Sequence, residues 1–215
     1  MRGEDGRLRV IVLGEHAPAS TTDFFVLNVC RARGDAVLTS AAILRAESVS
    51  VSLQGPWASA LADYRKLLGK QAPLCCAIMT RTGELPLVHP IWQDDTTKLV
   101  LTTRELQPAL AARLGARAEV LGIEALDART ALASLHGRGM KLVSVEAGPS
   151  TTGPLHRAPS PVRELLLSLY EGPSQSLELG GALAARLLQD RVCVADARRE
   201  EQSGAWRFQR WLSPE

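Results

Sequence analysis

The apolar positions of this chain form short runs that alternate with stretches of helical spacing. Runs rich in branched residues, or alternating between apolar and polar positions, predict β-strands. They lie at 8–13, 36–38, 74–79, 98–101, 118–121, 141–145, 165–170, 191–197 and 206–211. Segments with apolar residues every three or four positions predict helices at 22–31, 56–68, 108–115 and 128–136, with a further short helix at 182–188.

The order of these elements indicates the fold class. Strands that alternate with helices are typical of a parallel sheet covered on both faces. After residue 163 the strands follow one another with little helix between them, which favours antiparallel pairing. We therefore expect an α/β fold with three layers, α/β/α, a mostly parallel central sheet and antiparallel C-terminal strands, and we expect residues 1–215 to form a single domain.

Composition narrows the classes of partner. The 215 residues carry a net charge of +2, so no broad basic field recommends nucleic acid. No uncharged apolar stretch is long enough to span a bilayer, and residues 1–5 lack the apolar segment of a signal peptide, so we expect a cytoplasmic protein with no membrane partner. The four cysteines show no CxxC spacing and no paired histidines, which predicts buried thiols and no metal site.

Two of the predicted strands run into small-residue turns. In KLVSVEAGPSTT, at 141–152, Gly148 lets a ligand approach the backbone, and Ser150 and Thr151 offer hydrogen-bond donors suited to phosphate. An ordinary strand, turn and helix would look much the same. The stretch 35–48 repeats the pattern, with Thr39 and Ser40 at the turn. Ligands of open α/β sheets bind outside the carboxyl ends of the strands, so the two turns could frame one site.

Five stretches resemble one family when they are taken in order. They are CRARGDAVLTSAA at 30–42, GELP at 83–86, VLTT at 100–103, VEAGPS at 145–150 and RELLL at 163–167. Together they resemble the reductase domain of bacterial riboflavin biosynthesis, the C-terminal part of RibD-type proteins, which has the dihydrofolate-reductase-like fold. The resemblance covers most of the chain.

The resemblance implies an oxidoreductase that uses NADPH. It would transfer a hydride to the ribosyl C1 of a phosphoribosylamino-pyrimidine, or to a related small carbonyl or imine substrate, and it would form a homodimer through the later strands. The cofactor-binding residues implied are Thr39, Ser40, Ala41, Ala42, Thr80, Thr102, Thr103, Ala147, Gly148, Pro149, Ser150 and Thr151. Those implied for catalysis are Glu47, Ser48 and Glu146.

The chain also departs from the family pattern. Ile43 stands where the family has a threonine, Glu47-Ser48 replaces a pair of acids followed by proline, and Ala147 replaces a glycine. Near the first strand an aspartate is missing, and Glu15 or His16 would have to replace it. Glu146 either caps backbone amides or acts in the site. These departures leave an alternative open: a diverged member with little or no catalysis, acting as a nucleotide-binding or interaction protein.

Overall fold

The computed structural model describes residues 1–215 except 2, 4–5, 49, 174–176 and 215. The chain divides into two compact units, and each is described by itself. Unit 1 consists of Met1–Phe25 and Thr152–Glu215, and unit 2 consists of Val26–Thr151. Helix α1 (Thr21–Arg33) begins in unit 1 and ends in unit 2. The single domain expected from the sequence stays a prediction.

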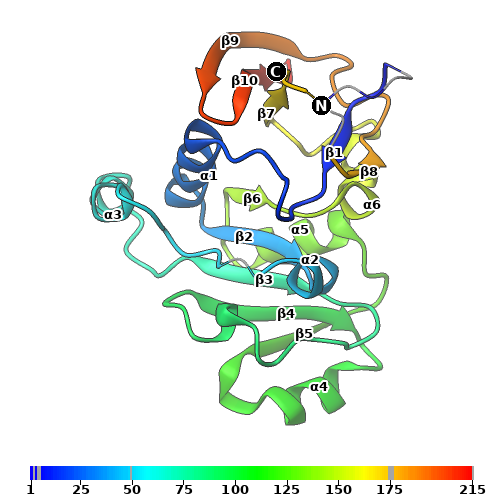
Figure 1. The fold of residues 1–215 in the computed structure, drawn as a ribbon. Helices are drawn as coiled ribbons and strands as arrows, with labels where there is room; N and C mark the ends of the chain where they lie inside the picture. The colour runs from blue at the N-terminus through cyan, green and yellow to red at the C-terminus, as the bar shows by residue number, and fades with distance from the viewer. Residues whose placement is uncertain (2, 4–5, 49, 174–176, 215) are drawn as a thin grey trace. The chain divides into compact units, whose positions relative to one another are not determined.

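Unit 2 is built on a parallel sheet of five strands, shown in Figure 1 with their arrowheads pointing the same way. The strands are β2 (Ala36–Ser40), β3 (Cys75–Met79), β4 (Thr97–Thr103), β5 (Glu119–Ile123) and β6 (Val143–Val145). Their order across the sheet is β5-β4-β3-β2-β6. β2 and β3 are buried along their whole length, as strands covered on both faces should be. The predicted parallel sheet is thus confirmed.

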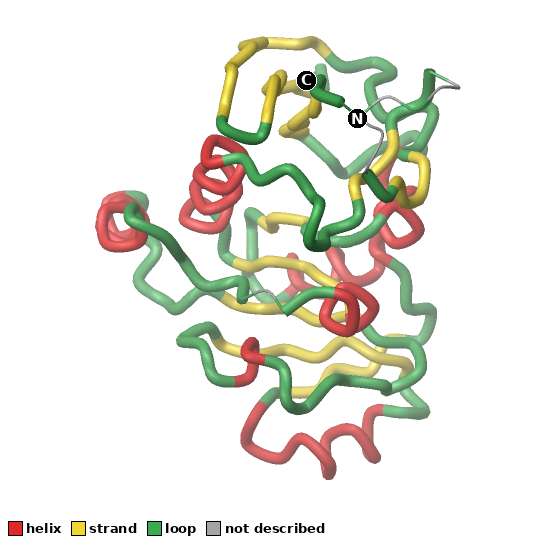
Figure 2. Tube along the Cα trace, in the orientation of Figure 1, coloured by secondary structure: helices red, strands yellow, loops and turns green. Residues whose placement is uncertain are grey.

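Helices cover both faces of this sheet (Figure 2). The helices of unit 2 are α2 (Ala41–Ala46), α3 (Ala58–Leu67), α4 (Gln107–Leu114) and α5 (Ala128–Gly137), with short 3₁₀ turns at Pro90–Trp92 and Gly115–Arg117. α6 (Pro149–Thr152) ends at the boundary with unit 1, in which Gly153–His156 forms a further 3₁₀ turn. On one face Leu38 and Leu101 pack with Leu135 of α5. The opposite face has one cluster containing Val37 and Leu44 of α2 and another containing Val100 and Leu110 of α4. The sheet and the helices packed on its two faces form the predicted three-layer α/β/α arrangement.

The start of α5 shows how local sequence sets an element. Asp127 accepts a hydrogen bond from the amide of Thr130, and the Thr130 hydroxyl accepts one from the amide of Asp127. This reciprocal pair forms a capping box and satisfies amides that have no partner within the helix. Asp127 is thus the N-cap of the helix predicted at 128–136.

Unit 1 contains two antiparallel sheets. β1 (Arg9–Ile11) pairs with β8 (Leu179–Ala182). β7 (Glu164–Tyr170), β9 (Val192–Glu201) and β10 (Gly204–Leu212) form a three-stranded sheet in the order β7-β10-β9. Tyr170, Trp206 and Phe208 pack on one face of this sheet, with the rings of Tyr170 and Trp206 edge to face at 5.2 Å. The antiparallel C-terminal strands are confirmed.

One expectation about unit 1 is wrong. The segment 182–188 is not a helix, because Ala182 ends β8 and 185–190 form turns. The strand predicted at 8–13 is present as β1, and it pairs with β8, whose Gly180-Gly181 pair lacks the side chains from which a strand is recognised. The strand predicted at 206–211 is also present, as β10, which pairs with a neighbour on each side.

Among the described residues, no helix combines the length and the apolar character that crossing a membrane requires.

Candidate active site

The two turns singled out in the sequence lie side by side at one edge of the sheet. All five strands of unit 2 are parallel, so their carboxyl ends meet at that edge, and β2 pairs directly with β6. The amide of Glu146 donates to the carbonyl of Leu38 at 2.8 Å, which extends this pairing past the end of β6. Beyond it, the Ile43 Cδ1 atom lies 4.0 Å from the place that a Cβ on Gly148 would occupy.

Gly148 is not required by the fold. Its φ is not in the left-handed region, and a Cβ built on it would meet nothing closer than Ile43. A glycine that neither backbone strain nor crowding demands leaves room beside the main chain. A ligand that lies against the backbone of this turn would use that room, so the residues present fit a nucleotide whose phosphates bind amides and hydroxyls.

The predicted cofactor-binding residues divide into a buried and an accessible set. The buried ones are Thr39, Ser40, Ala41, Thr80 and Thr102, and the partly or fully exposed ones are Ala42, Thr103, Ala147, Gly148, Pro149, Ser150 and Thr151. Two buried hydroxyls serve local structure. Ser40 accepts from the amide of Ile43 at 3.4 Å, and Thr80 accepts from the amide of Gly83 at 3.0 Å. The accessible residues are therefore the ones able to contact a ligand directly.

Thr102 differs from the other buried hydroxyls. Its side chain is completely buried, and its Oγ1 has no hydrogen-bond partner among the described residues. A buried hydroxyl without a partner costs about 1–3 kcal/mol. Thr102 lies near the end of β4, next to the accessible Thr103, so the unsatisfied group is close to the carboxyl edge of the sheet.

Glu146 has a partner that the sequence did not reveal. Its carboxylate accepts three hydrogen bonds from the guanidinium of Arg31, the shortest 2.7 Å from Nη2 to Oε2, and one of 3.3 Å from the hydroxyl of Ser144. The Arg31 side chain is 3% exposed and that of Glu146 15%. As one member of a bidentate ion pair, the Glu146 carboxylate is held in place and can orient neighbouring groups.

Glu47 is a carboxylic acid of a different kind. It ends α2, and its carboxylate makes no hydrogen bond or ion pair within the described part of the chain, whereas burial raises the pKa of the carboxyl above its usual value. Its backbone carbonyl is held by His89 Nε2 at 2.7 Å, while His89 Nδ1 accepts from the amide of Ile91. Ser48 follows and is exposed. Glu47 and Glu146 thus have opposite environments.

Arg31 and His89 are the two residues that sequence reasoning missed. Arg31 follows Asn28 by three positions, and both are buried on the same side of α1. A charged residue on the buried side of a predicted helix could have indicated that Arg31 has a buried partner. His89 is buried too, with 5% exposure, yet nothing in the sequence beside Pro90 marks it as the partner of a residue 42 positions earlier.

Unit 1 holds a cavity, lined by Ala19, Thr21 and Thr22 and by Arg199, Glu200, Glu201, Gln202 and Ser203. The carboxylate of Glu201 accepts from the amides of Thr21 and Thr22 there, so the β9–β10 turn itself supplies the anion at the start of α1. Glu15 and His16 are exposed in a turn of the same unit. Neither this cavity nor the turn with Glu15 and His16 provides evidence for a functional site within unit 1.

Comparison with known proteins agrees with the fold. The model of the RibD C-terminal domain matches residues 5–159. A pyrimidine reductase-like protein from Corynebacterium diphtheriae superimposes with a TM-score of 0.69 at 19% identity, over 92% of this chain and 83% of that one. Comparison with curated proteins found no significant match.

Two further solved structures are similar. RibD from Acinetobacter baumannii gives a TM-score of 0.66 at 16% identity, and the match covers 99% of this chain but 56% of that protein. The riboflavin biosynthesis reductase of Saccharomyces cerevisiae gives 0.61 at 12% identity, over 95% of this chain and 84% of the other. At such identities the structures establish a shared fold, and the chain spans little more than half of the RibD protein.

Proposed function

The chain belongs to the RibD C-terminal domain family, a family of riboflavin-biosynthesis reductases, and we propose that it is an NADPH-dependent reductase. Its substrate would be a phosphoribosylamino-pyrimidine, reduced at the ribosyl C1, or a related small carbonyl or imine. The observation that carries this proposal is that the turn after β6 lies beside the start of α2, at the carboxyl edge of the parallel sheet. That edge is where open α/β sheets bind their ligands.

The accessible residues of the two turns would hold the cofactor. Gly148 gives the approach to the backbone, and Ser150, Thr151 and Thr103 offer hydroxyls. When bound, NADPH supplies the hydride. The chain's own contribution is to bind and orient it, which turns an encounter between two molecules into a reaction within one complex.

Arg81 supports the choice of NADPH over NADH. It follows Thr80 directly after β3, is exposed, and makes no hydrogen bond or ion pair with any described residue. Two other arginines that follow strands of the sheet are already engaged: Arg45 of α2 donates to the carbonyl of Glu84, and Arg104, after β4, pairs with Glu124. The two nucleotides differ by one phosphate, for which a guanidinium is a well-matched partner.

Glu47 is the group proposed to supply the proton. A raised pKa keeps more of a carboxyl group protonated near neutral pH than an exposed glutamate would be. Its carboxylate has no partner within the described residues, so it is free to bind substrate. Ser48 would add an accessible hydroxyl beside it. Glu146, held by Arg31, would orient the substrate.

Ile43 favours a second candidate function. The resemblance predicts a threonine at this position, but the Ile43 Cδ1 lies 4.0 Å from the place of a Cβ on Gly148, so an apolar group lies beside the cofactor turn. A diverged protein that binds a nucleotide but turns over slowly would have this character. It would show tight NADPH binding without hydride transfer to any pyrimidine substrate.

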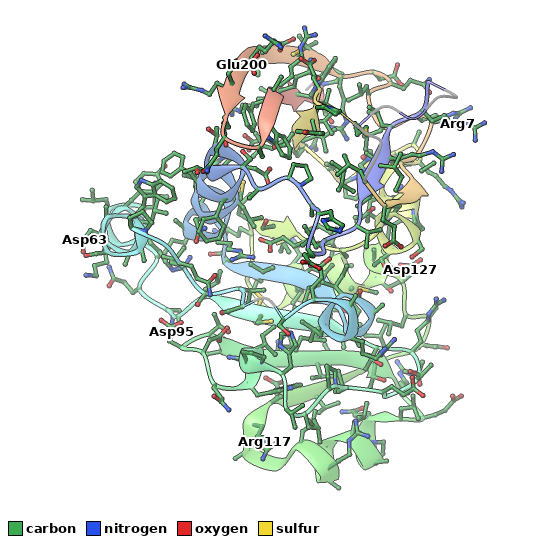
Figure 3. The ribbon with its side chains drawn as sticks, viewed as in Figure 1. Arg7, Asp63, Asp95, Arg117, Asp127 and Glu200 are labelled. Carbon is green, nitrogen blue, oxygen red and sulfur yellow. The ribbon has the colours of Figure 1, made fainter. Side chains whose placement is uncertain are left out.

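Titration with NADPH and with NADH tests the proposal, followed by nicotinamide fluorescence and by thermal stability. The wild type should bind NADPH more tightly, and Arg81→Gln should remove most of that preference. Arg117→Gln is the matched control, because Arg117 is exposed and precedes β5, at the opposite edge of the sheet (Figure 3). Absence of binding to either nucleotide near millimolar concentration would refute the cofactor site.

We also infer that the protein is a homodimer. Leu165, Leu167 and Leu169 of β7 share a sheet face with Trp211, and the register places Tyr170 and Trp206 on the other. In the described part of the chain β7 pairs on one side only, and an apolar edge of this kind favours association. Sedimentation equilibrium at micromolar concentration should give twice the monomer mass, and a monomer would contradict the inference.

A further inference from the structure

The guanidinium of Arg31 uses both of its sides. On one side it binds the Glu146 carboxylate, with Nε to Oε1 at 3.0 Å and Nη2 to Oε2 at 2.7 Å. On the other side Nη1 donates to the carbonyls of Ser50 and Ser52, at 3.1 and 3.3 Å. A single buried side chain from α1 therefore joins two segments that lie far apart in the sequence.

The network continues beyond Arg31. The hydroxyl of Ser50 donates to Asp94 Oδ2 at 2.7 Å, and Asp94 Oδ1 accepts from Lys98 Nζ at 2.7 Å. The Asp94 and Lys98 side chains are 9% and 5% exposed. Anion and cation alternate from Glu146 to Lys98, with Ser50 as the link, so the group is neutral as a whole and each charge has a hydrogen-bonded partner.

Both segments joined by Arg31 border residues of the proposed site. Glu146 leads directly into the turn 147–151, and Ser50 and Ser52 follow shortly after Glu47 and Ser48 in the sequence. Resting on the proposed function, we propose that Arg31 is a positioning residue, which sets the cofactor turn and the segment after the acid relative to each other. It acts through Glu146 and through the two serine carbonyls.

The shape of the guanidinium, as well as its charge, explains why position 31 is an arginine. Its planar fork presents donors in two directions, whereas a lysine ammonium is a point charge on a flexible stem. Arg31→Lys keeps the charge and cannot reach Glu146 and both carbonyls at once. Glu146→Gln keeps the shape and removes the charge, so the two variants separate the contributions.

Arg65 provides a matched control. It too is a buried arginine of unit 2, with 8% exposure, and it donates to the carbonyls of Ala32, Gly34 and Ala72. None of these residues belongs to the proposed site. Arg65→Lys therefore repeats the chemical change and the loss of buried hydrogen bonds in the same unit.

The experiment compares Arg31→Lys, Glu146→Gln and Arg65→Lys by free energy of unfolding, by amide hydrogen exchange and by NADPH affinity. All three should be less stable than the wild type. Only Arg31→Lys and Glu146→Gln should accelerate exchange at residues 147–151, and both should weaken NADPH binding at least tenfold. Added guanidinium, at millimolar concentration, should restore part of the affinity to Arg31→Ala and none to Arg65→Ala.

Two outcomes decide separate questions. If Arg31→Lys and Arg65→Lys lose similar stability and neither changes exchange in the turn, Arg31 has only a structural role and the inference is overturned. If the wild type binds no NADPH, the proposed function fails, yet the exchange measurement still decides whether Arg31 positions the turn.

Discussion

His89 donates through Nε2 to the backbone carbonyl of Glu47, at 2.7 Å. Its other ring nitrogen accepts from the amide of Ile91 at 3.1 Å, and this fixes the tautomer. The main chain that carries the candidate acid is thereby tied to the segment after β3. Both of these contacts of the imidazole are with main-chain groups, and neither involves a metal or a carboxylate. The buried side chain therefore links two loops.

Replacing His89 should affect both stability and turnover. His89→Ala leaves the Glu47 carbonyl and the Ile91 amide without these partners, at a cost of about 1–3 kcal/mol in the free energy of unfolding. We expect kcat to fall as well, because the acid is less well placed. The control is Trp92→Phe, which removes the indole bond to the Pro86 carbonyl in the same segment and should lower stability but not kcat. Equal kcat values in both variants would contradict this role.

Glu47→Gln should change the pH profile. Because burial raises the pKa of Glu47, the protonated donor persists above the usual range, and kcat/KM should decline as the pH rises through that pKa. In the variant this decline should vanish and kcat should drop by about 10²-fold or more. Glu84→Gln, at an exposed carboxylate, should leave the profile unchanged. A wild-type decline that survives in Glu47→Gln would assign the proton to another group.

Glycine substitutions should separate stability from binding. In Gly122→Ala the new Cβ would lie 2.4 Å from Gln107 Oε1 and 3.0 Å from the Arg104 Cα, so unfolding should be easier by about 1–3 kcal/mol. Gly148→Ala meets no such obstacle and should be about as stable as the wild type, yet it should weaken NADPH binding at least tenfold. Gly137→Ala, also uncrowded and within α5, should not lower stability and should leave NADPH binding unchanged. Calorimetry and fluorescence titration measure the two effects.

Asp94 should make stability sensitive to acid. Burial opposes ionisation, but hydrogen bonds from Lys98, Thr96 and Ser50 outweigh it and lower the pKa of Asp94 below its ordinary 3.8. The stabilisation is therefore complete above pH 3.8 and is lost as the pH falls through the lower, folded-state pKa. Asp94→Asn leaves Lys98 buried without its counter-ion, at about 3–5 kcal/mol. Urea unfolding from pH 2 to 7 should show a smaller acid loss in the variant.

The sequence predicted the parallel sheet well because its strands are buried on both faces. Uninterrupted apolar runs such as 74–79 leave little ambiguity, and Asp127 marked a helix start by its capping chemistry. Gly180 and Gly181 concealed β8, since a strand without side chains has no pattern to read. The two neighbours of β10 could not be predicted either, because the alternation of apolar and polar residues identifies the faces of a strand but not the strands beside it.

The candidate site was predicted only in part, for a related reason. Turns such as 147–151 can be recognised from their small and hydroxyl-bearing residues. Arg31 and His89, in contrast, act through contacts that exist only after folding. Glu146 could be named as important, but its partner lies 115 positions earlier. Side-chain pairs of that separation leave no local signature in a single sequence.

The division of the chain has a consequence for its biosynthesis. Unit 2 is one continuous stretch, so the strands and turns of the proposed site can assemble while the ribosome is still adding later residues. Unit 1 is split between the two ends of the chain: β1 is made early, but its partner β8 emerges only after the whole of unit 2. β1 is therefore made without its partner β8, which follows only when all of unit 2 has been synthesised.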